Sequence, residues 1–441
     1  MDLDPLNIPM LYGRIAIAAA ALSHGLFATL VVGSAVIGAA VATMAYLTDR
    51  PSYRRLAHTI AFALVVSTAT ISFLGVSLIF ALNIFWPRFW HRIFRIMFWP
   101  FVLEAGLFLG EAVFAYSWFY LWDWSTVAGW RRRLHLTFAW LAALCAVVAM
   151  FLIDITASYM LTPHPPDSAW ANILNPTMIH LDLHRWFGNL TWAGFTLAAL
   201  CAIGFLRAGT PEDRTHYRWA AAFCFAIGFG ALLIMPLIGY HYLLNLRYGQ
   251  PQAFHVLMLG RRSWLFDLVA LLYGLLVFTG SGYIASVVFA RAPTESMARA
   301  FLPLSLAVLG AAALLLAQPY HLQHVPGLWR LTDQVINPWG KMQPHKYFAL
   351  TFLVLFGLAN WLYFLRWFPQ ARQQVLHAEH AGRRERRQSY LLITVAVAAM
   401  AIMLGMGWVR ESARAVDGYL IYGYMTFADE RPTYEGCDPC P

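Results

Sequence analysis

Charged side chains are scarce in this chain, and their scarcity argues against a water-soluble protein. Only 12% of the 441 residues are Asp, Glu, Lys or Arg, about half the share found in soluble domains. Hydrophobic residues make up 60% of the chain, and the mean hydropathy is +0.57. So large an apolar surface cannot face water, and we expect it to face lipid.

Lysine and cysteine are also scarce. Lys341 and Lys346 are the only lysines, so nearly all positive charge is arginine. The net charge of +9 lies in short clusters between apolar runs, a pattern typical of membrane-protein loops and not of a nucleic-acid surface. The five cysteines provide no disulfide framework, and the Cys437-x-x-Cys440 motif lacks the histidine of a c-type heme site. A disulfide, a metal site and no role all stay open for these two cysteines.

Ten apolar runs are long enough to cross a bilayer, which takes about 20 residues in a helix. They cover residues 14–46, 56–85, 97–122, 134–160, 184–206, 217–243, 263–290, 300–317, 346–368 and 389–409. Polar, proline-containing connectors separate some of them, and we find no internal repeat or soluble domain. The sequence therefore predicts an all-α, polytopic transmembrane bundle that forms one membrane domain over residues 1–441.

The arginine clusters predict the orientation. The clusters near residues 50–55, 131–133, 207–218, 291–299 and 383–387 fall on one side of the predicted bundle. Cytoplasmic loops are rich in arginine and lysine, so this side is expected to be cytoplasmic and both termini to lie outside.

Ionisable residues inside apolar spans are costly and therefore point to function. In the predicted orientation they share the outer half of the membrane, which favours a single site. The candidates are Arg14, His24, Glu104, Glu111, Asp182, His184, Arg410, Glu411 and Arg414.

Histidine and carboxylate without a nearby cysteine fit heme iron better than zinc, because neutral imidazole is a common axial ligand of heme. Arginine suits heme propionates, and the aromatic content of 16% provides flat packing surfaces. Glu104 and Glu111 are seven residues apart and share one helix face, which suits proton delivery or charge compensation. The alternative for each histidine and each carboxylate is a purely structural role as a hydrogen-bonded residue of the core.

Four segments, taken in order, resemble subunit I of the cytochrome bd-type oxygen reductases. The segments are GRIAIAAAALSHGLF (13–27), FWPFVLEAGLFLGEAVFAYSWFYLWD (98–123), NPTMIHLDLHRW (175–186) and GWVRESARAVDGYLIYG (407–423). The resemblance implies that His24 and Glu411 each ligate a high-spin heme and that His184 ligates a low-spin heme. It also implies two or three b hemes, with heme d as the alternative at the oxygen site.

The same resemblance implies the setting of the reaction. It implies reduction of O₂ to water in a bacterial cytoplasmic membrane, together with a second membrane subunit. Residues 14–206 then form the heme-binding spans, 207–343 a divergent part, 344–423 the last two spans with the Glu/Arg motif, and 424–441 a tail on the outer side.

The chain departs from the family pattern in four places. The two glutamates are seven residues apart where eight is usual, and residues 244–346 hold two apolar spans in place of the long hydrophilic quinol-binding loop. Ala415, Val416 and Asp417 replace a Gln-Pro-Trp, and Leu353 replaces the methionine that ligates the low-spin heme. A second ligand opposite His184 is therefore open, and we favour His345 over Met342, His321, His324, His255, Met258, His241 and His180.

The favoured hypothesis is a divergent bd-like terminal oxidase subunit that receives electrons from a cytochrome c or a partner heme subunit. The missing quinol loop motivates this choice of donor. Two alternatives stay open: a b-heme electron-transfer subunit of a larger respiratory complex without oxygen chemistry, and a cofactor-free transporter or structural membrane subunit.

Overall fold

The computed structural model describes residues 10–163, 172–260, 262–291, 296–321, 323, 327–328, 330, 344–367 and 382–430. Ten helices among these residues are long and apolar enough to cross a membrane, which confirms the predicted fold class. They are α1 (Met10–Thr48), α2 (Pro51–Phe85), α4 (Phe98–Tyr120), α5 (Trp130–Tyr159), α7 (Met178–Arg207), α8 (Pro211–Gly249), α10 (Ser263–Arg291), α11 (Ser296–Leu316), α12 (Pro344–Trp367) and α14 (Arg383–Ala415).

Shorter elements join or cover these helices. They are α3 (Pro87–Ile96), η1 (Trp122–Ser125), α9 (Pro251–Met258), β1 (Tyr419–Ile421), β2 (Met425–Thr426) and η4 (Phe427–Glu430). Strands β1 and β2 pair antiparallel, a small departure from the all-α expectation. Helix α3, which lies between two predicted spans, has ten residues and is too short to cross a bilayer. It buries Phe89 and Ile93, which lie four residues apart on one face.

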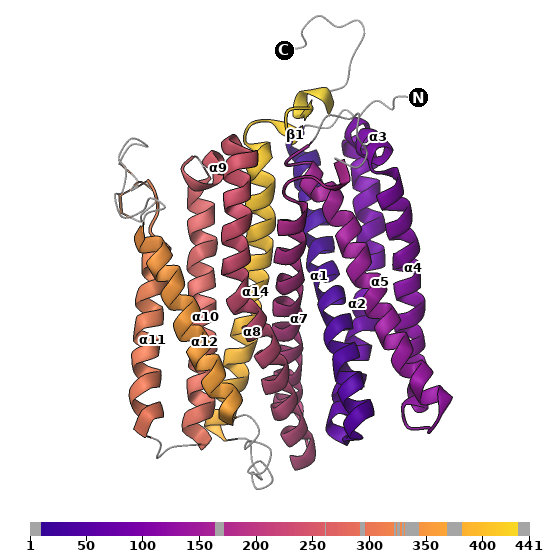
Figure 1. The fold of residues 1–441 in the computed structure, drawn as a ribbon, viewed down its shortest axis with the longest axis vertical. Helices are drawn as coiled ribbons and strands as arrows, with labels where there is room; N and C mark the ends of the chain where they lie inside the picture. The colour runs from indigo at the N-terminus through magenta and orange to yellow at the C-terminus, as the bar shows by residue number, and fades with distance from the viewer. Residues whose placement is uncertain are drawn as a thin grey trace, which may run out of the picture.

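The start of α1, the end of α14, α3, α9 and the β1–β2 hairpin all lie at one end of the bundle, called here the cap end (Figure 1). Residues 424–430 belong to this cap, although the sequence predicted a tail from residue 424. Arginines hold the segment in place: the Arg88 Nη1 donates to the Asp429 carbonyl at 3.0 Å, and the Arg92 Nη1 donates to the Tyr424 carbonyl at 3.3 Å. Both contacts lie at the surface and join this segment to α3.

Helix α7 runs through the middle of the bundle and packs closely on its neighbours (Figure 1). At Gly33 of α1, a Cβ atom would lie 2.2 Å from the Asn189 carbonyl oxygen of α7. At Gly194 of α7, it would lie 2.6 Å from the backbone of Gly228 in α8. Small residues let membrane helices approach this closely, and here they bring α1 and α8 against the helix that carries His184.

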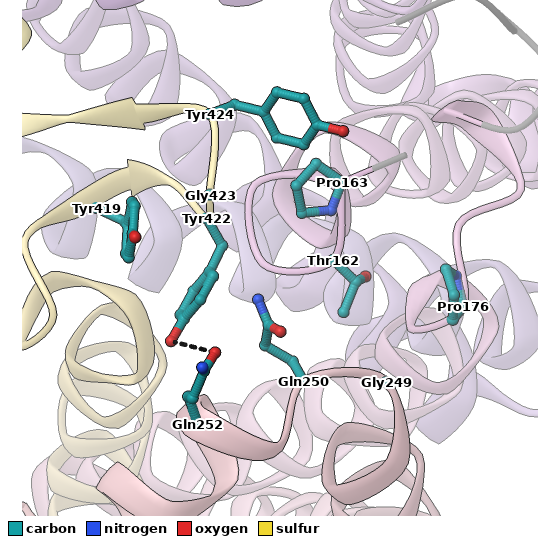
Figure 2. A pocket seen from close by; sticks show the side chains of 10 residues that line it. All are labelled: Thr162, Pro163, Pro176, Gly249, Gln250, Gln252, Tyr419, Tyr422, Gly423 and Tyr424. Atoms are coloured by element: carbon teal, nitrogen blue, oxygen red, sulfur yellow. Dashed lines mark hydrogen bonds between the residues drawn. The ribbon is translucent and has the colours of Figure 1, made fainter. Parts of the chain in front are cut away.

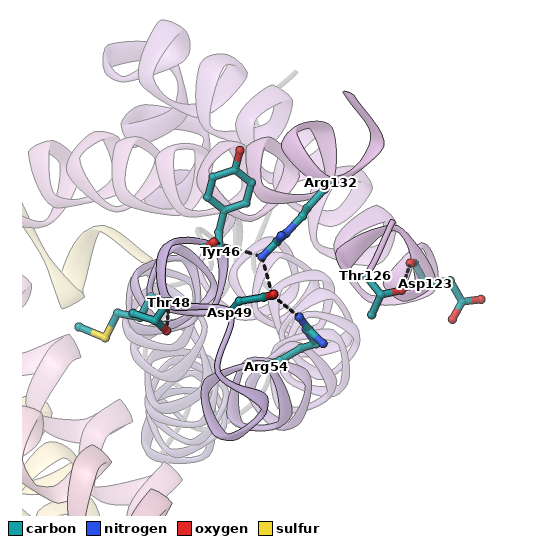
Figure 3. Close-up of polar contacts among 8 residues, drawn as sticks. Tyr46, Thr48, Asp49, Arg54, Asp123, Thr126 and Arg132 are labelled. Carbon is teal, nitrogen blue, oxygen red and sulfur yellow. Dashed lines mark hydrogen bonds and ion pairs between the residues drawn. The ribbon is translucent and has the colours of Figure 1, made fainter. Parts of the chain in front are cut away.

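A polar cluster around Asp49 joins three helices at the opposite end of the bundle (Figure 3). The Asp49 Oδ1 lies 2.7 Å from the Arg54 Nη2 and 3.0 Å from the Arg132 Nη2, and the same Arg132 nitrogen donates to the Tyr46 carbonyl at 3.1 Å. Asp49 has a φ of 51°, in the left-handed region that Asp tolerates better than most residues. The tight turn between α1 and α2 therefore directs its carboxylate toward both arginines.

Candidate functional site

The central feature of the site is an ion pair between Asp154 of α5 and Arg185 of α7. The Arg185 Nη1 donates to the Asp154 Oδ1, and Asp154 is fully buried. Asp182, nearly one turn earlier on α7, is an electrostatic neighbour of Asp154. Asp182 is among the residues predicted from sequence, but neither member of the pair is. Asp154 is an ionisable residue within an apolar run, so the rule that selected the other candidates applies to it as well.

The predicted Glu/Arg motif of α14 lies next to this pair. The Glu411 Oε2 is 2.5 Å from the Arg414 Nη2, and Arg414 also donates through Nη1 to the Leu420 carbonyl in the cap. The side chain of Arg414 is 6% exposed, whereas that of Glu411 is 48% exposed, so the paired carboxylate keeps an open side. Arg410 interacts electrostatically with Glu411 and with Asp154. Arg410 thus links the motif to the central ion pair.

His24 of α1 faces Gly75 of α2. A Cβ atom at Gly75 would lie 3.2 Å from the His24 Cε1, so any side chain there would be in tight contact with the ring. The Nδ1 of His24 is buried and has no hydrogen-bond partner within the described residues. Arg185 interacts electrostatically with the ring, which places His24 beside the charged cluster.

His184 of α7 faces α8 in a similar way. Its Cε1 lies 3.5 Å from the position of a Cβ atom at Gly239, and its ring is tilted against that of Tyr242 with centroids 6.3 Å apart. The Nδ1 of His184 is buried and lacks a partner in the described part of the chain.

The Asn-Pro before His184 has a local structural reason. The Asn175 side chain is buried and donates to the Ser158 hydroxyl at 2.8 Å, and Thr162 and Thr177 lie 2.7 Å apart at their hydroxyls. These bonds tie the end of α5 to the start of α7. They therefore fix where the helix bearing His184 begins.

Glu104 and Glu111 lie on α4. Glu111 is 3% exposed, its Oε1 has no partner among the described residues, and it interacts electrostatically with Glu104, as their shared helix face predicts. A Cβ atom at Gly110 would lie 3.2 Å from the Cys145 Sγ of α5, so this part of α4 packs on α5. The two glutamates form a pair of their own along that interface.

Other predicted residues lie elsewhere. Arg14 is exposed, and its guanidinium lies 4.3 Å from the centroid of the Phe427 ring in the cap. His345 is in the first turn of α12, but its side chain falls outside the described residues, as do His324 and Met342. His321 contacts the Leu259 carbonyl at 3.0 Å, whereas the buried Nδ1 of His180 has no partner in the described chain. Leu353, at the expected methionine position, is fully buried in the core.

A pocket of about 370 Å³ opens at the cap end (Figure 2). The Tyr422 hydroxyl lies 2.8 Å from the Asp417 Oδ2 and 3.4 Å from the Gln252 Oε1, and burial together with this carboxylate raises the pKa of Tyr422. The lining residues are Thr162, Pro163, Pro176, Gly249, Gln250, Gln252, Tyr419, Tyr422, Gly423 and Tyr424. Sequence analysis did not find this pocket, because its walls come from four separate segments.

The residues present fit heme. His24 and His184 each offer a buried Nδ1 without a partner among the described residues, and each ring lies against a glycine of the neighbouring helix, Gly75 or Gly239. A single imidazole suits porphyrin iron, because the macrocycle supplies the equatorial ligands. Arg414 is a buried cation, and Arg410 is a second cation that interacts with the same glutamate, Glu411. Positive charges of this kind suit heme propionates. A multi-pass helical bundle with such side chains is typical of integral-membrane heme proteins.

The chain belongs to the family of cytochrome bd terminal oxidase subunit I, whose family model matches residues 12–257. The matched region includes His24, Glu104, Glu111 and His184. The resemblance found in the sequence is thereby confirmed at the level of the family. The chain is thus a multi-pass membrane protein of an oxidoreductase family that carries heme and takes part in electron transport.

The fold has a counterpart among solved structures. The bd oxidase from Geobacillus thermodenitrificans matches with a TM-score of 0.51 and 14% sequence identity, over 90% of this chain and 98% of that chain. At this identity the match supports the fold alone. A search of curated proteins gave no match.

Proposed function

We propose that this chain is the heme-carrying subunit of a bd-like terminal oxidase that reduces O₂ to water in the bacterial cytoplasmic membrane. The observation that carries the proposal is the pair of half-buried imidazoles, His24 and His184, whose Nδ1 atoms are buried and have no partner among the described residues. When bound, heme supplies the one-electron redox centres and the iron at which O₂ is reduced. Family membership favours this reading over a cofactor-free transporter.

In this proposal each candidate residue has a separate role. His24 and Glu411 each ligate a high-spin heme, and His184 ligates a low-spin heme with His345 as its second ligand. Arg410 and Arg414 neutralise propionates, and Arg14 does so from the cap side. Glu104 and Glu111 hold protons along the α4–α5 interface and release them toward the oxygen site, a task that suits carboxyl groups buried in apolar surroundings.

The proposed electron donor is a cytochrome c or a heme-bearing partner subunit. Two helices, α10 and α11, lie between α8 and α12, where the family pattern has a hydrophilic quinol-binding loop. The described segment that follows α8 is the short helix α9, which packs against α8, α10 and α14. A protein donor at the cap end would lie close to the candidate heme ligands.

The test is a pyridine hemochrome assay with a CO-difference spectrum on the purified protein. We expect two or three hemes per chain, at least one of which binds CO. Colourless protein would overturn the proposal, and heme without any CO-reactive fraction would favour the electron-transfer subunit. Oxygen consumption with reduced cytochrome c and with a short-chain quinol then tests the donor, and a strong preference for quinol would reverse that assignment.

A further inference from the structure

The ion pair of Asp154 and Arg185 involves the residue next to one candidate heme ligand, His184, and an electrostatic neighbour of the other, His24. Arg185 directly follows His184 on α7, and its guanidinium also interacts electrostatically with the ring of His24 on α1. Its partner Asp154 comes from a third helix, α5. One positive charge is therefore shared by the surroundings of both histidines.

The pair is embedded in protein. Asp154 has no exposed surface, and the Arg185 side chain is 23% exposed. The second carboxylate oxygen of Asp154, Oδ2, has no partner among the described residues. Charges act over longer distances in such a setting than in water, because the effective dielectric constant is about 20 or lower, compared with about 80.

Other charged side chains surround the pair. Arg410 of α14 interacts electrostatically with Asp154 of α5, and Asp182 is an acidic neighbour of Asp154. Together with Glu411 and Arg414, the cluster contains three acidic and three arginine side chains. Asp154 is the fully buried member and the partner that offsets Arg185.

We propose that the Asp154–Arg185 ion pair sets the reduction potentials of the two redox centres held by His24 and His184. The inference rests on the proposed heme ligation by these two histidines. Reduction adds one electron to a centre, and no bond or proton need change at the pair. A nearby positive charge stabilises the reduced form, and Asp154 limits this effect by neutralising Arg185.

The experiment is a spectroelectrochemical titration of the full-length protein and its variants. Asp154→Asn leaves the charge of Arg185 without its partner, so we expect both potentials to rise. The expected change in each reduction equilibrium is about tenfold, which for one electron is about 59 mV. Arg185→Gln should lower both potentials by a similar factor, and Asp154→Asn/Arg185→Gln should return them close to the wild-type values.

A matched control tests whether the loss of an ion pair elsewhere in the protein changes the reduction potentials in the same way. The Arg218 Nη1 of α8 lies 3.9 Å from the Glu385 Oε1 of α14, and these side chains are 19% and 22% exposed. Glu385→Gln removes a carboxylate from its cation in the same way, but at the end of the bundle opposite the cap (Figure 1). We expect it to leave the potentials unchanged.

The outcomes are distinguishable from failure of the proposed function. If wild-type protein contains no heme, the proposed function fails before any potential is measured. If heme content is normal but Asp154→Asn and Arg185→Gln leave the potentials unchanged, or move them in the same direction, the pair is only a structural contact. Should one single variant fail to fold, the other decides, because each alone is expected to shift both potentials, and unchanged potentials at normal heme content would overturn the proposal.

Discussion

Arg414 pairs with Glu411 three residues earlier on α14, and the same guanidinium donates to the Leu420 carbonyl of the cap. One nitrogen orients the carboxylate proposed to ligate heme, and the other holds the hairpin that begins four residues after the helix ends. This side chain therefore joins the cap to the site directly. Damage to the cap and damage to the site should appear together.

Arg414→Gln is expected to lower both stability and heme content. The substitution leaves the Glu411 carboxylate without its cation and the Leu420 carbonyl without its donor, at a cost of roughly 2 kcal/mol or more. Thermal unfolding and heme per protein measure the two effects. Arg386→Gln, at an exposed arginine of the same helix, is the control and should change neither. Normal heme content in Arg414→Gln would show that Glu411 needs no partner.

Gly75→Val should displace His24 and reduce the heme bound through it. A Cβ atom at this position already lies 3.2 Å from the His24 Cε1, and valine adds two methyl groups to that contact. The measurement is the heme content of purified protein together with the high-spin part of its absorption spectrum. Gly106→Val is the control, because a Cβ atom there meets no other atom within 4 Å. Equal heme loss in both variants would mean that valine harms helix packing generally.

Glu111→Gln should slow oxygen consumption at least about tenfold while leaving heme content unchanged, because the amide cannot accept or release a proton. Glu111→Asp keeps a carboxyl group and should recover part of the rate. Glu104→Gln is expected to have a smaller effect, since Glu104 is only partly buried whereas Glu111 is 3% exposed. A Glu111→Gln protein with wild-type turnover would remove this residue from proton delivery.

The cap should become less stable as pH rises toward neutrality. Burial raises the pKa of Glu430 to about 7 from an ordinary value of 4.5, and the charge of Asp429 adds to this increase. The backbone N–H groups of Phe89 and Arg88 and the charge of Arg88 partly oppose it. A raised pKa in the folded state means that the stabilising contribution is complete below pH 4.5 and is lost as pH rises through about 7. The loss is at most about 3 kcal/mol.

Hydrogen exchange of the Phe89 amide, followed between pH 5 and pH 8 and corrected for intrinsic exchange, measures this effect. In Glu430→Gln the neutral amide oxygen can still accept the Phe89 N–H, so protection should no longer depend on pH. Glu212→Gln, at an exposed glutamate at the start of α8, should keep the wild-type pH dependence. A pH dependence that persists in Glu430→Gln would assign the titration to another group.

Much of the candidate site could be predicted from sequence because it lies in short motifs. His24, His184 and the Glu411–Arg414 pair stand out as polar residues in apolar surroundings, and the last two are three residues apart on one helix. The partner of Arg185 could not be identified in this way. Asp154 is 31 positions away on another helix, and no periodicity states which helices become neighbours.

Two features of the cap end could not be predicted from sequence, for a related reason. Helix α3 is too short for a search based on spans, and the residues after 424 contain too few apolar side chains to indicate a core. The two segments stabilise each other through hydrogen bonds. Arg88 donates to the Asp429 carbonyl, the Phe89 N–H donates to the Glu430 carboxyl group, and Arg92 donates to the Tyr424 carbonyl. Contacts of this kind exist only once the helices are assembled.

The sequence by itself determined the number of spans and the helical class, because the transfer of about 20 residues into lipid depends on local hydropathy. It also determined which residue types carry chemistry, since intramembrane ionisable groups are rare. Only the tertiary structure decided which charges meet, where glycine leaves room for an imidazole, and how the chain folds back to form the cap. Those features depend on distances between segments remote in sequence, and close packing of several helices fixes such distances.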